Sequence, residues 1–367
     1  MKKKLFIQSI YSAPYRAGVF RQLSEEFDIF VIFERNSDKN RNKDWFIHDL
    51  GFNGVILDSN DALEKYNMEL KALKSYDAVL VYDYSTVSSI KLMLKCLQLK
   101  VPYLINCDGA LIKKRHIIKD VIKEFFISRA KACLASGNHA ENYFLSYGAK
   151  KENIFIHNFS NLYKEDVLDE TILNEEKKQI KEKLGFPIDK KIVLSVGRFT
   201  YIKGFDILLK SWNLINNHAQ LIIVGGGEKE QEYRHLIKEN KIENVTIDGF
   251  KPRATLFDYY KASDLFVLPT RGDVWGLVIN EAMACGLPVI TTNKCVAGLE
   301  LIENYKNGFI VENEDYKELS EKMIYILEND EMCLSMGREN LNKIRPYIIE
   351  NVSDSHINTF KLILGDS

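Results

Sequence analysis

The first half of the chain alternates short, continuously apolar runs with segments of helical periodicity. The apolar runs that read as strands are residues 4–9, 29–33, 55–57, 78–82, 103–106 and 132–136. Helical spacing recurs between them, for example at residues 18–26, 85–99 and 117–130. Apolar strands separated by helices are typical of a parallel sheet that is covered on both faces, so this half predicts a doubly wound α/β domain.

The second half repeats this rhythm after a charged segment. Residues 158–186 are rich in lysine and acids, and we expect one helix at 175–184 that ends at Gly185. The strand-like runs beyond it are residues 191–196, 220–224, 244–247, 265–268, 288–291 and 308–311. Helical patterns follow two of these strands, at residues 205–215 and 228–240. The tail from 315 to 364 also has a helical pattern, which Pro346 should break.

The whole pattern predicts an α/β protein with two doubly wound Rossmann-like domains that face each other across a cleft. We expect residues 1–165 to form the N-terminal domain and residues 188–345 the C-terminal domain. Residues 346–367 should form a C-terminal helix that can pack back on the N-terminal domain. Ligands of such sheets bind outside the carboxyl ends of the strands, so residues that follow strands are the first candidates for a site.

The composition excludes several classes of protein. Of 367 residues, 46% are hydrophobic and 28% are charged, which excludes collagen-like, disordered and coiled-coil chains. Lysine and arginine number 50 against 51 acids, a balance that argues against a nucleic-acid binder. No run reaches the roughly 18 apolar residues that a membrane span needs, so we expect a cytoplasmic protein.

The cysteines and histidines give no sign of a metal site. None of the six cysteines belongs to a CxxC pair, and none lies beside a histidine at ligand spacing. The seven histidines show neither HxH nor HExxH. The sequence therefore predicts buried, reduced thiols, no metal and no cofactor.

Two cations follow the first strand of the second half. Arg198 comes directly after that strand, and Lys203 precedes the next helix. Both would project from one loop at the carboxyl end of the strand, where a guanidinium and an ammonium group together can neutralise a diphosphate leaving group. The alternative is a pair of solvated surface cations.

A second group of residues runs from Asp273 to Glu281 and continues as AMACGLPVI. Gly276 is expected to open a helix, whose free N–H groups would point at an anion. Glu281 would lie further along that helix, where a charge inside an apolar run needs a polar partner such as a ribose diol. The alternative is an acid at a helix N-terminus plus a solvated glutamate. The triple glycine 225–227 is weaker, because it does not match GxGxxG and fits a plain strand-to-helix turn.

Three segments together carry a family resemblance: 195–204 (SVGRFTYIKG), 222–228 (IIVGGGE) and 273–290. They resemble the retaining glycosyltransferases of family 4, which have the GT-B fold, and the resemblance is strongest over residues 191–311. It implies that the C-terminal domain binds a nucleotide-diphosphate sugar. Arg198 and Lys203 match the family's cations on the diphosphate.

The resemblance implies roles for further residues. Asp273 matches the acid that contacts sugar hydroxyls, and Glu281 the acid that binds the ribose. Gly276, Leu277 and Val278 match the backbone donors near the diphosphate. The segment whose backbone reads the base in the family corresponds here to Phe250 and Lys251.

Two departures from the family pattern bear on the reaction. The first family acid is usually glutamate, and here it is the shorter Asp273. Where the family often has His-Gly after an N-terminal strand, this chain has Asp108-Gly109, so Asp108 is the candidate acceptor-side residue. The alternative for Asp108 is an ordinary Asp-Gly turn.

The loop from Tyr11 to Gly18 follows the first strand. In a GT-B enzyme this loop lies over the donor diphosphate, which makes Gly18 and Arg16 candidate contacts. A structural turn explains the same residues equally well.

A basic stretch occupies residues 113–131 and contains seven cations against two acids. Its apolar positions give it an amphipathic pattern, and a basic amphipathic helix can lie on an anionic membrane. A surface helix that packs on a sheet shows the same pattern. Under the membrane interpretation, the protein would associate with the inner face of the membrane.

These observations predict a retaining glycosyltransferase of the hexosyltransferase class. It would transfer a hexose or N-acetylhexosamine, without a metal, to a saccharide or lipid-linked saccharide acceptor in cell-surface polysaccharide biosynthesis. UDP is the default nucleotide because of its frequency in the family. Two alternatives stay open: a GT-B-like sugar-nucleotide 2-epimerase, and a non-catalytic sugar-nucleotide-binding module.

Overall fold

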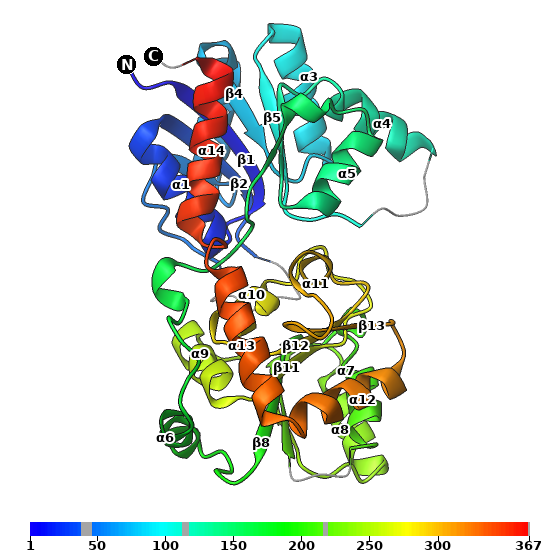
Figure 1. Ribbon diagram of the computed structural model, residues 1–367. Helices are drawn as coiled ribbons and strands as arrows, with labels where there is room; N and C mark the ends of the chain where they lie inside the picture. Colours follow the sequence, from blue (N-terminus) through cyan, green and yellow to red (C-terminus); the bar gives the residue numbers. More distant parts are fainter. Residues whose placement is uncertain (38–45, 112–116, 216–218, 366–367) are drawn as a thin grey trace. The chain divides into compact units, whose positions relative to one another are not determined.

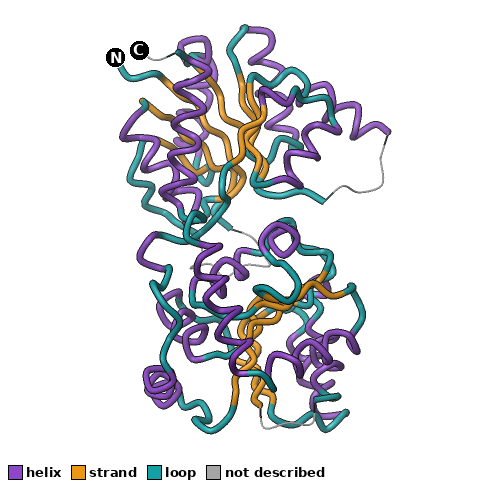
Figure 2. Tube along the Cα trace, in the orientation of Figure 1, coloured by secondary structure: helices purple, strands orange, loops and turns teal. Residues whose placement is uncertain are grey.

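The computed structural model describes residues 1–37, 46–111, 117–215 and 219–365 (Figure 1). The chain divides into two compact units. The first contains Met1–Asn161 and Tyr347–Ser367, and the second contains Leu162–Pro346. Each unit has a sheet of strands with helices on both sides (Figure 2).

The first unit is built on a parallel sheet that has seven strands in the described residues, in the order β3-β2-β1-β4-β5-β6-β7. The strands are β1 (Lys4–Tyr11), β2 (Asp28–Arg35), β3 (Gly54–Ile56), β4 (Ala78–Val81), β5 (Tyr103–Cys107), β6 (Ala132–Ala135) and β7 (Ile154–Ile156). The central strands β4 and β5 are buried throughout and β1 is buried over five consecutive residues, which matches their continuous apolar sequence.

Helices cover both faces of this sheet (Figure 1). They are α1 (Pro14–Glu26), α2 (Asn60–Lys71), α3 (Val87–Leu99), α4 (Ile117–Ile127), α5 (Asn138–Ser146) and α14 (Ile349–Leu364). The first unit also has the short 3-10 helices η2 (Leu73–Ser75) and η3 (Lys151–Asn153), and the second unit begins with η4 (Lys164–Asp166). On one face, Met93 of α3, Phe126 of α4 and Phe144 of α5 share one apolar cluster with the strands. On the other face α14 packs against α1, and the ring centres of Phe27 and Phe360 lie 5.6 Å apart.

The second unit repeats the design with six parallel strands in its described residues, in the order β10-β9-β8-β11-β12-β13. The strands are β8 (Lys191–Arg198), β9 (Ala219–Gly226), β10 (Val245–Asp248), β11 (Leu265–Leu268), β12 (Val289–Thr292) and β13 (Gly308–Val311). The helices are α6 (Asn174–Leu184), η5 (Tyr201–Lys203), α7 (Phe205–Trp212), α8 (Glu230–Glu239), α9 (Arg253–Ala262), α10 (Leu277–Ala284), α11 (Val296–Leu301), α12 (Tyr316–Leu327) and α13 (Asp330–Ile344). Phe205, Tyr233 and Met323 bring α7, α8 and α12 into one core with the sheet.

The predicted fold class is confirmed, since both units are doubly wound parallel α/β structures. The structure places the division between Asn161 and Leu162, so the charged segment that the sequence left between the domains belongs to the second unit. Lys177 and Lys181 of α6 hold that segment, because both pair with Asp264, at 2.8 and 3.4 Å. The helical tail breaks around Pro346 as predicted, between α13 and α14.

One predicted boundary is wrong. The loop expected from Tyr11 to Gly18 ends early, because α1 begins at Pro14. Proline favours the first position of a helix, since its φ is fixed near the helical value and it needs no hydrogen-bond acceptor there. Gly18 therefore lies inside α1 and is buried, rather than in a loop at the edge of the sheet.

Candidate functional site

Lys203 and Asp273 form an ion pair at the carboxyl edge of the second sheet. Lys203 ends η5, which follows β8, and Asp273 follows β11, the neighbour of β8 in the sheet. Each side chain is 14% exposed, so the pair is mostly withdrawn from solvent but still reachable. The structure thus brings together two residues that the sequence predicted separately as a diphosphate ligand and a sugar ligand.

The turn that carries Lys203 is held by Arg271, a residue that the sequence did not single out. Its guanidinium donates to both carboxylate oxygens of Asp206, at 2.8 and 2.7 Å. The guanidinium carbon Cζ also lies 4.0 Å from the centre of the Tyr201 ring. The Arg271 backbone N–H also donates to Ile202 O at 2.7 Å. Hydrogen bonds from Arg271 lower the pKa of Asp206 against the opposing effect of burial. The position of Lys203 is therefore fixed by contacts outside the turn itself.

Two glycines let the backbone pass close to this pair. Gly204 has φ +71°, and a Cβ there would lie 2.0 Å from Pro269 O. Gly276 has φ +103°, and a Cβ there would lie 2.8 Å from Cys295 Sγ and 3.6 Å from Asp273 Oδ2. Both positions therefore require glycine, because other residues rarely adopt positive φ and would also collide with neighbours.

Gly276 caps the N-terminus of α10, as the sequence predicted. Leu277 and Val278 form the first turn of this helix, and their N–H groups have no acceptor within the helix. Asp273 lies just before the turn, and its Oδ1 accepts from Trp275 N at 3.4 Å. The helix start and the Lys203–Asp273 pair thus occupy the same small region.

Glu281 lies one and a half turns further along α10 and is 7% exposed. Its Oε2 accepts a hydrogen bond of 2.8 Å from the Tyr260 hydroxyl, and Arg253 Nη1 lies 3.7 Å from Oε1. Burial and the nearby carboxylate raise the pKa of Tyr260 well above its ordinary value, so its hydroxyl remains a donor. The polar partners that the sequence demanded for this buried acid thus include Tyr260 and Arg253, both on α9.

Arg198 ends β8, and its side chain makes no hydrogen bond or ion pair with any residue that the structure describes. Backbone packing explains two of the three neighbouring glycines, since a Cβ at Gly225 would lie 1.9 Å from Gly197 O, whereas a Cβ at Gly226 would have nothing within 4 Å. Gly227 resembles Gly225, because a Cβ there would lie 2.8 Å from Phe199 O. The ends of β8 and β9 therefore meet closely, and Arg198 is left as a half-buried cation at that edge.

The segment predicted to read the base follows β10. Phe250 is 51% exposed, and Lys251 pairs with Asp248 at 2.8 Å. Hydrogen bonds from Lys251 and the Tyr259 hydroxyl lower the pKa of Asp248, although burial acts in the opposite direction. The side chain of Lys251 is thus engaged with its own loop, and the ring of Phe250 is the accessible group.

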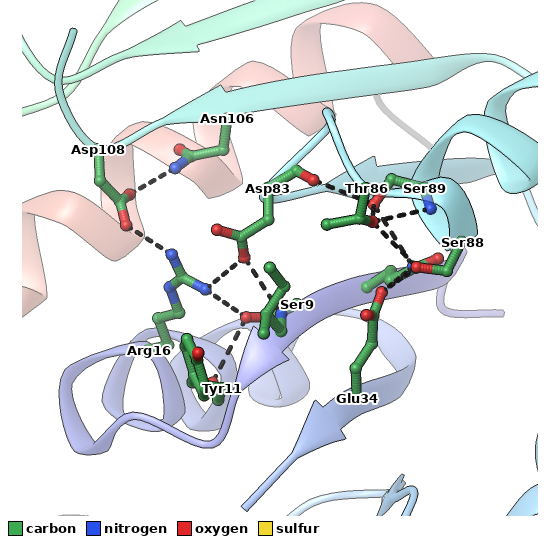
Figure 3. A network of polar contacts seen from close by, with 12 residues as sticks. Ser9, Tyr11, Arg16, Glu34, Asp83, Thr86, Ser88, Ser89, Asn106 and Asp108 are labelled. Carbon is green, nitrogen blue, oxygen red and sulfur yellow. Dashed lines mark hydrogen bonds and ion pairs between the residues drawn. The ribbon is translucent and has the colours of Figure 1, made fainter. Parts of the chain in front are cut away.

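Asp108 lies in the first unit, at the end of β5, within a network of polar contacts around Arg16 (Figure 3). Arg16 is 9% exposed and donates to Asp108 Oδ2 and to Asp83 Oδ2, each at 2.8 Å. Asn106 donates to the other oxygen of Asp108 at 2.6 Å, and Ile10 N donates to Asp83 at 3.1 Å. Burial alone would lower the pKa of Arg16, but the two carboxylates raise it well above its ordinary value.

This network changes the interpretation of Arg16. Its charge is matched by two carboxylates, so it positions Asp108 instead of presenting a free cation to a phosphate. Asp83 was missed by the sequence analysis. It follows β4 and has a φ of +48°, a strained conformation for a residue with a side chain. The only signal for it in the sequence was its place after a buried strand.

The comparisons with known proteins agree with the chemistry of the second unit. Residues 176–343 match the model of the family described as "Glycosyl transferases group 1". The matched segment contains Arg198, Lys203, Asp273 and Glu281.

The curated relatives match over part of their length. An uncharacterized glycosyltransferase of Haemophilus influenzae is 34% identical over 170 residues, which is 45% of this chain and 47% of the relative. The capsular polysaccharide biosynthesis glycosyltransferase CapM of Staphylococcus aureus is 28% identical over 179 residues, 47% of each chain. The matched segments thus span about half the length of these relatives.

Solved structures match over nearly the whole chain. HepE of Anabaena, solved in complex with UDP, superposes with a TM-score of 0.79 at 17% identity, over 98% of this chain and all of that one. Sucrose-phosphate synthase of Thermosynechococcus elongatus superposes with a TM-score of 0.77 at 19% identity, over the whole of both chains. At such identities the likeness establishes the fold, and the GT-B fold class that the sequence predicted is confirmed.

Other features of the described residues bear on metals, membranes and surface hollows. Within the described ranges, no group of three or more His, Cys, Asp or Glu side chains is arranged to hold a metal. No helix in the described part of the chain is long and apolar enough to cross a membrane. Two open hollows lined by residues 48–63 lie in the first unit and contain none of the predicted site residues.

Proposed function

We propose that this protein is a retaining glycosyltransferase of family 4 that uses a nucleotide-diphosphate sugar, with UDP-sugars as the first donors to test. The observation that carries the proposal is the Lys203–Asp273 pair beside the Gly276-capped start of α10. A group 1 domain over residues 176–343 supports it, as does the fold shared with a protein solved with UDP.

In this proposal the diphosphate displaces Asp273 from Lys203. The ammonium group then binds phosphate oxygens, and Asp273 becomes free to accept from sugar hydroxyls. Arg198, which has no partner among the described residues, supplies the second cation. The first N–H groups of α10 add donors at the same place. Stabilising the departing nucleotide in this way lowers the barrier because negative charge develops on the phosphate oxygens.

The other predicted residues take supporting roles in this proposal. Glu281, oriented by Tyr260, would bind the ribose, and the segment at Phe250 and Lys251 would read the base. Asp108 would act on the acceptor side as a hydrogen-bond acceptor, because Arg16 and Asn106 already orient its carboxylate. We further propose that the acceptor is a saccharide or lipid-linked saccharide and that no metal takes part.

A donor panel tests this function. UDP-, GDP- and ADP-sugars are each added in a thermal-shift assay, since a ligand that binds the folded state raises the melting temperature. Lys203→Met should weaken binding of the best donor by roughly tenfold to a hundredfold, the effect of losing a charge-assisted hydrogen bond. The matched control is Lys238→Met, which removes an exposed lysine on α8. No shift with any donor, or equal losses in both variants, would contradict the proposal.

A turnover assay then separates transfer from its alternatives. With the best donor and saccharide acceptors, NMR of the product should show the donor's anomeric configuration, and the rate should persist in EDTA. Donor incubated without acceptor should keep its sugar unchanged. An isomerised sugar in that control would instead identify an epimerase, and binding without any turnover would identify a sugar-nucleotide-binding module.

A further inference from the structure

Two carboxylates share one guanidinium at the carboxyl edge of the first sheet (Figure 3). Asp83 and Asp108 follow β4 and β5, which are neighbours in the sheet, and Arg16 donates to each of them at 2.8 Å. Their side chains are 28% and 16% exposed, so both acids are reachable from solvent. Ligands of doubly wound sheets bind at this edge, and a ligand of the first unit would therefore meet these acids.

One oxygen of Asp83 is available to such a ligand. Asp83 Oδ2 accepts from Arg16 Nη1 and from Ile10 N, at 2.8 and 3.1 Å, which fixes the orientation of the carboxylate. Asp83 Oδ1 has no partner in the described part of the chain (Figure 3). Asp108 differs, because Asn106 donates to its Oδ1 at 2.6 Å and Arg16 to its Oδ2. Of the two acids, Asp83 therefore has the oxygen that is better placed for a further hydrogen bond.

Two buried atoms beside these acids also lack partners. Asn106 is 2% exposed and Arg16 9%, and neither Asn106 Oδ1 nor Arg16 Nε has a hydrogen-bond partner among the described residues. The first atom requires a donor and the second an acceptor, because buried polar groups are paired in folded proteins. A hydroxyl both donates and accepts, whereas an ionised carboxylate only accepts. The unpaired atoms thus match the hydroxyls of a sugar.

The charges at this edge oppose an acidic ligand. One guanidinium faces two carboxylates, so the group formed by Arg16, Asp83 and Asp108 has a net negative charge. Glu34, which accepts from Gln8 Nε2 at 2.6 Å, adds a third carboxylate to the network in Figure 3. A phosphate or carboxylate brought here would face like charges, which weakens binding. The cations at residues 113–115 of the predicted basic stretch lie outside the described residues.

We propose that Asp83 determines acceptor specificity by accepting a hydrogen bond from a hydroxyl of the acceptor sugar at Oδ1. Together with Asp108, it selects a neutral sugar and rejects a uronic acid or a sugar phosphate. The acceptor class is therefore a saccharide whose contacted sugar has no acidic group. This inference rests on the proposed function, because it takes the ligand of the first unit to be the acceptor.

Saturation-transfer NMR with matched sugars tests the proposal on the whole chain, with UDP present. Methyl glucoside and methyl galactoside are titrated beside their uronides, which carry a carboxylate in place of the hydroxymethyl group, and glucose beside glucose 6-phosphate. At least one neutral sugar should bind, at least about tenfold more tightly than its acidic counterpart. Asp83→Asn should weaken binding of that sugar roughly tenfold, through the loss of a charge-assisted hydrogen bond, and should narrow its advantage over the acidic sugar.

Asp77→Asn is the matched control. Asp77 precedes β4 and Asp83 follows it, so the two acids lie at opposite edges of the sheet. Asp77 has similar contacts, since its Oδ2 accepts from Lys4 N at 2.7 Å and Lys3 Nζ lies 4.0 Å from its Oδ1. The control should leave every sugar affinity unchanged. Asp83 has a φ of +48°, which asparagine tolerates as well as aspartate, so Asp83→Asn preserves the turn.

Three outcomes would overturn the proposal. They are an acidic sugar that binds as tightly as its neutral counterpart, equal effects of the two substitutions, and no binding by any neutral sugar. A merely structural role for Asp83 would weaken both kinds of sugar alike and leave their ratio unchanged, which also counts against the proposal. Donor binding, measured by thermal shift, should be the same in both variants. Failure of the unmodified protein to bind any donor would count against the transferase, whereas an unchanged sugar ratio in Asp83→Asn would count against Asp83 alone.

Discussion

Replacing Gly204 by alanine tests whether the turn that positions Lys203 depends on the absence of a side chain. The chain offers a matched control in Gly185. The two glycines have φ of +71° and +70°, and each follows the last residue of a helix. A Cβ at Gly204 would lie 2.0 Å from Pro269 O, whereas a Cβ at Gly185 would have nothing within 4 Å. The two substitutions therefore share the backbone strain and differ in the collision.

The expected magnitudes follow from this difference. An alanine in the left-handed region costs about 1–2 kcal/mol, so Gly185→Ala should lower the free energy of unfolding by about that amount. Gly204→Ala adds a collision between backbone atoms that no rotamer change can relieve. Overpacking of this kind costs a further ~1–3 kcal/mol, which gives a total of about 2–5 kcal/mol. Because relief of the collision must move the turn, donor binding should weaken in Gly204→Ala and stay unchanged in Gly185→Ala.

The assay uses tryptophan fluorescence during urea unfolding. Trp212 and Trp275 are buried in the second unit, so a Trp45→Phe background leaves only reporters of that unit. Donor affinity is measured on the same proteins by titration. If the two variants lose stability equally, to within about 0.5 kcal/mol, the collision with Pro269 does not control the turn and the reasoning fails.

Three further predictions concern buried titratable side chains. Burial lowers the pKa of His356 from 6.5 to about 4, so the unfolded chain binds more protons between these pH values. The free energy of unfolding of the first unit, which contains His356, should then fall by about 3 kcal/mol as the pH drops through this range. His356→Gln should flatten the change in urea midpoints followed by circular dichroism. Asp264→Asn leaves the buried Lys181 without its carboxylate and should lower the free energy of unfolding by about 3 kcal/mol in the tryptophan fluorescence assay. A loss below about 1 kcal/mol would contradict this prediction. Arg271→Gln releases the turn that carries Lys203 and should raise the Kd for the donor roughly tenfold. An unchanged Kd would show that other contacts hold the turn.

The sheets were the part of the structure that the sequence predicted best. Strands buried on both faces leave a continuous apolar run, and two such runs, residues 265–268 and 308–311, were predicted with the observed bounds. Strand β7 was not predicted, because it has only three residues and is partly exposed at the edge of the sheet. A strand that short gives no periodicity to recognise.

The candidate site was predictable where strand order alone decides proximity. Lys203 and Asp273 both follow strands that are neighbours in a parallel sheet, so their carboxyl-end positions bring them together. The support for Lys203 was not predictable in the same way. Arg271 takes its carboxylate partners from Asp206 and Glu314, which are 65 and 43 residues away along the chain. No local pattern marks a residue whose role depends on partners at such separations.

Arg16 and Arg198 show why a cation after a strand does not by itself indicate an anion site. Both lie where a parallel strand gives way to the next element, and both invited the same interpretation as contacts of a diphosphate. The structure gives Arg16 two carboxylates, contributed by residues 67 and 92 positions away, while Arg198 has none among the described residues. A buried arginine paired in this way has no net charge to offer a ligand, and an unpaired one does. The ability of such a cation to bind a phosphate therefore depends on the acids around it, which only the folded chain reveals.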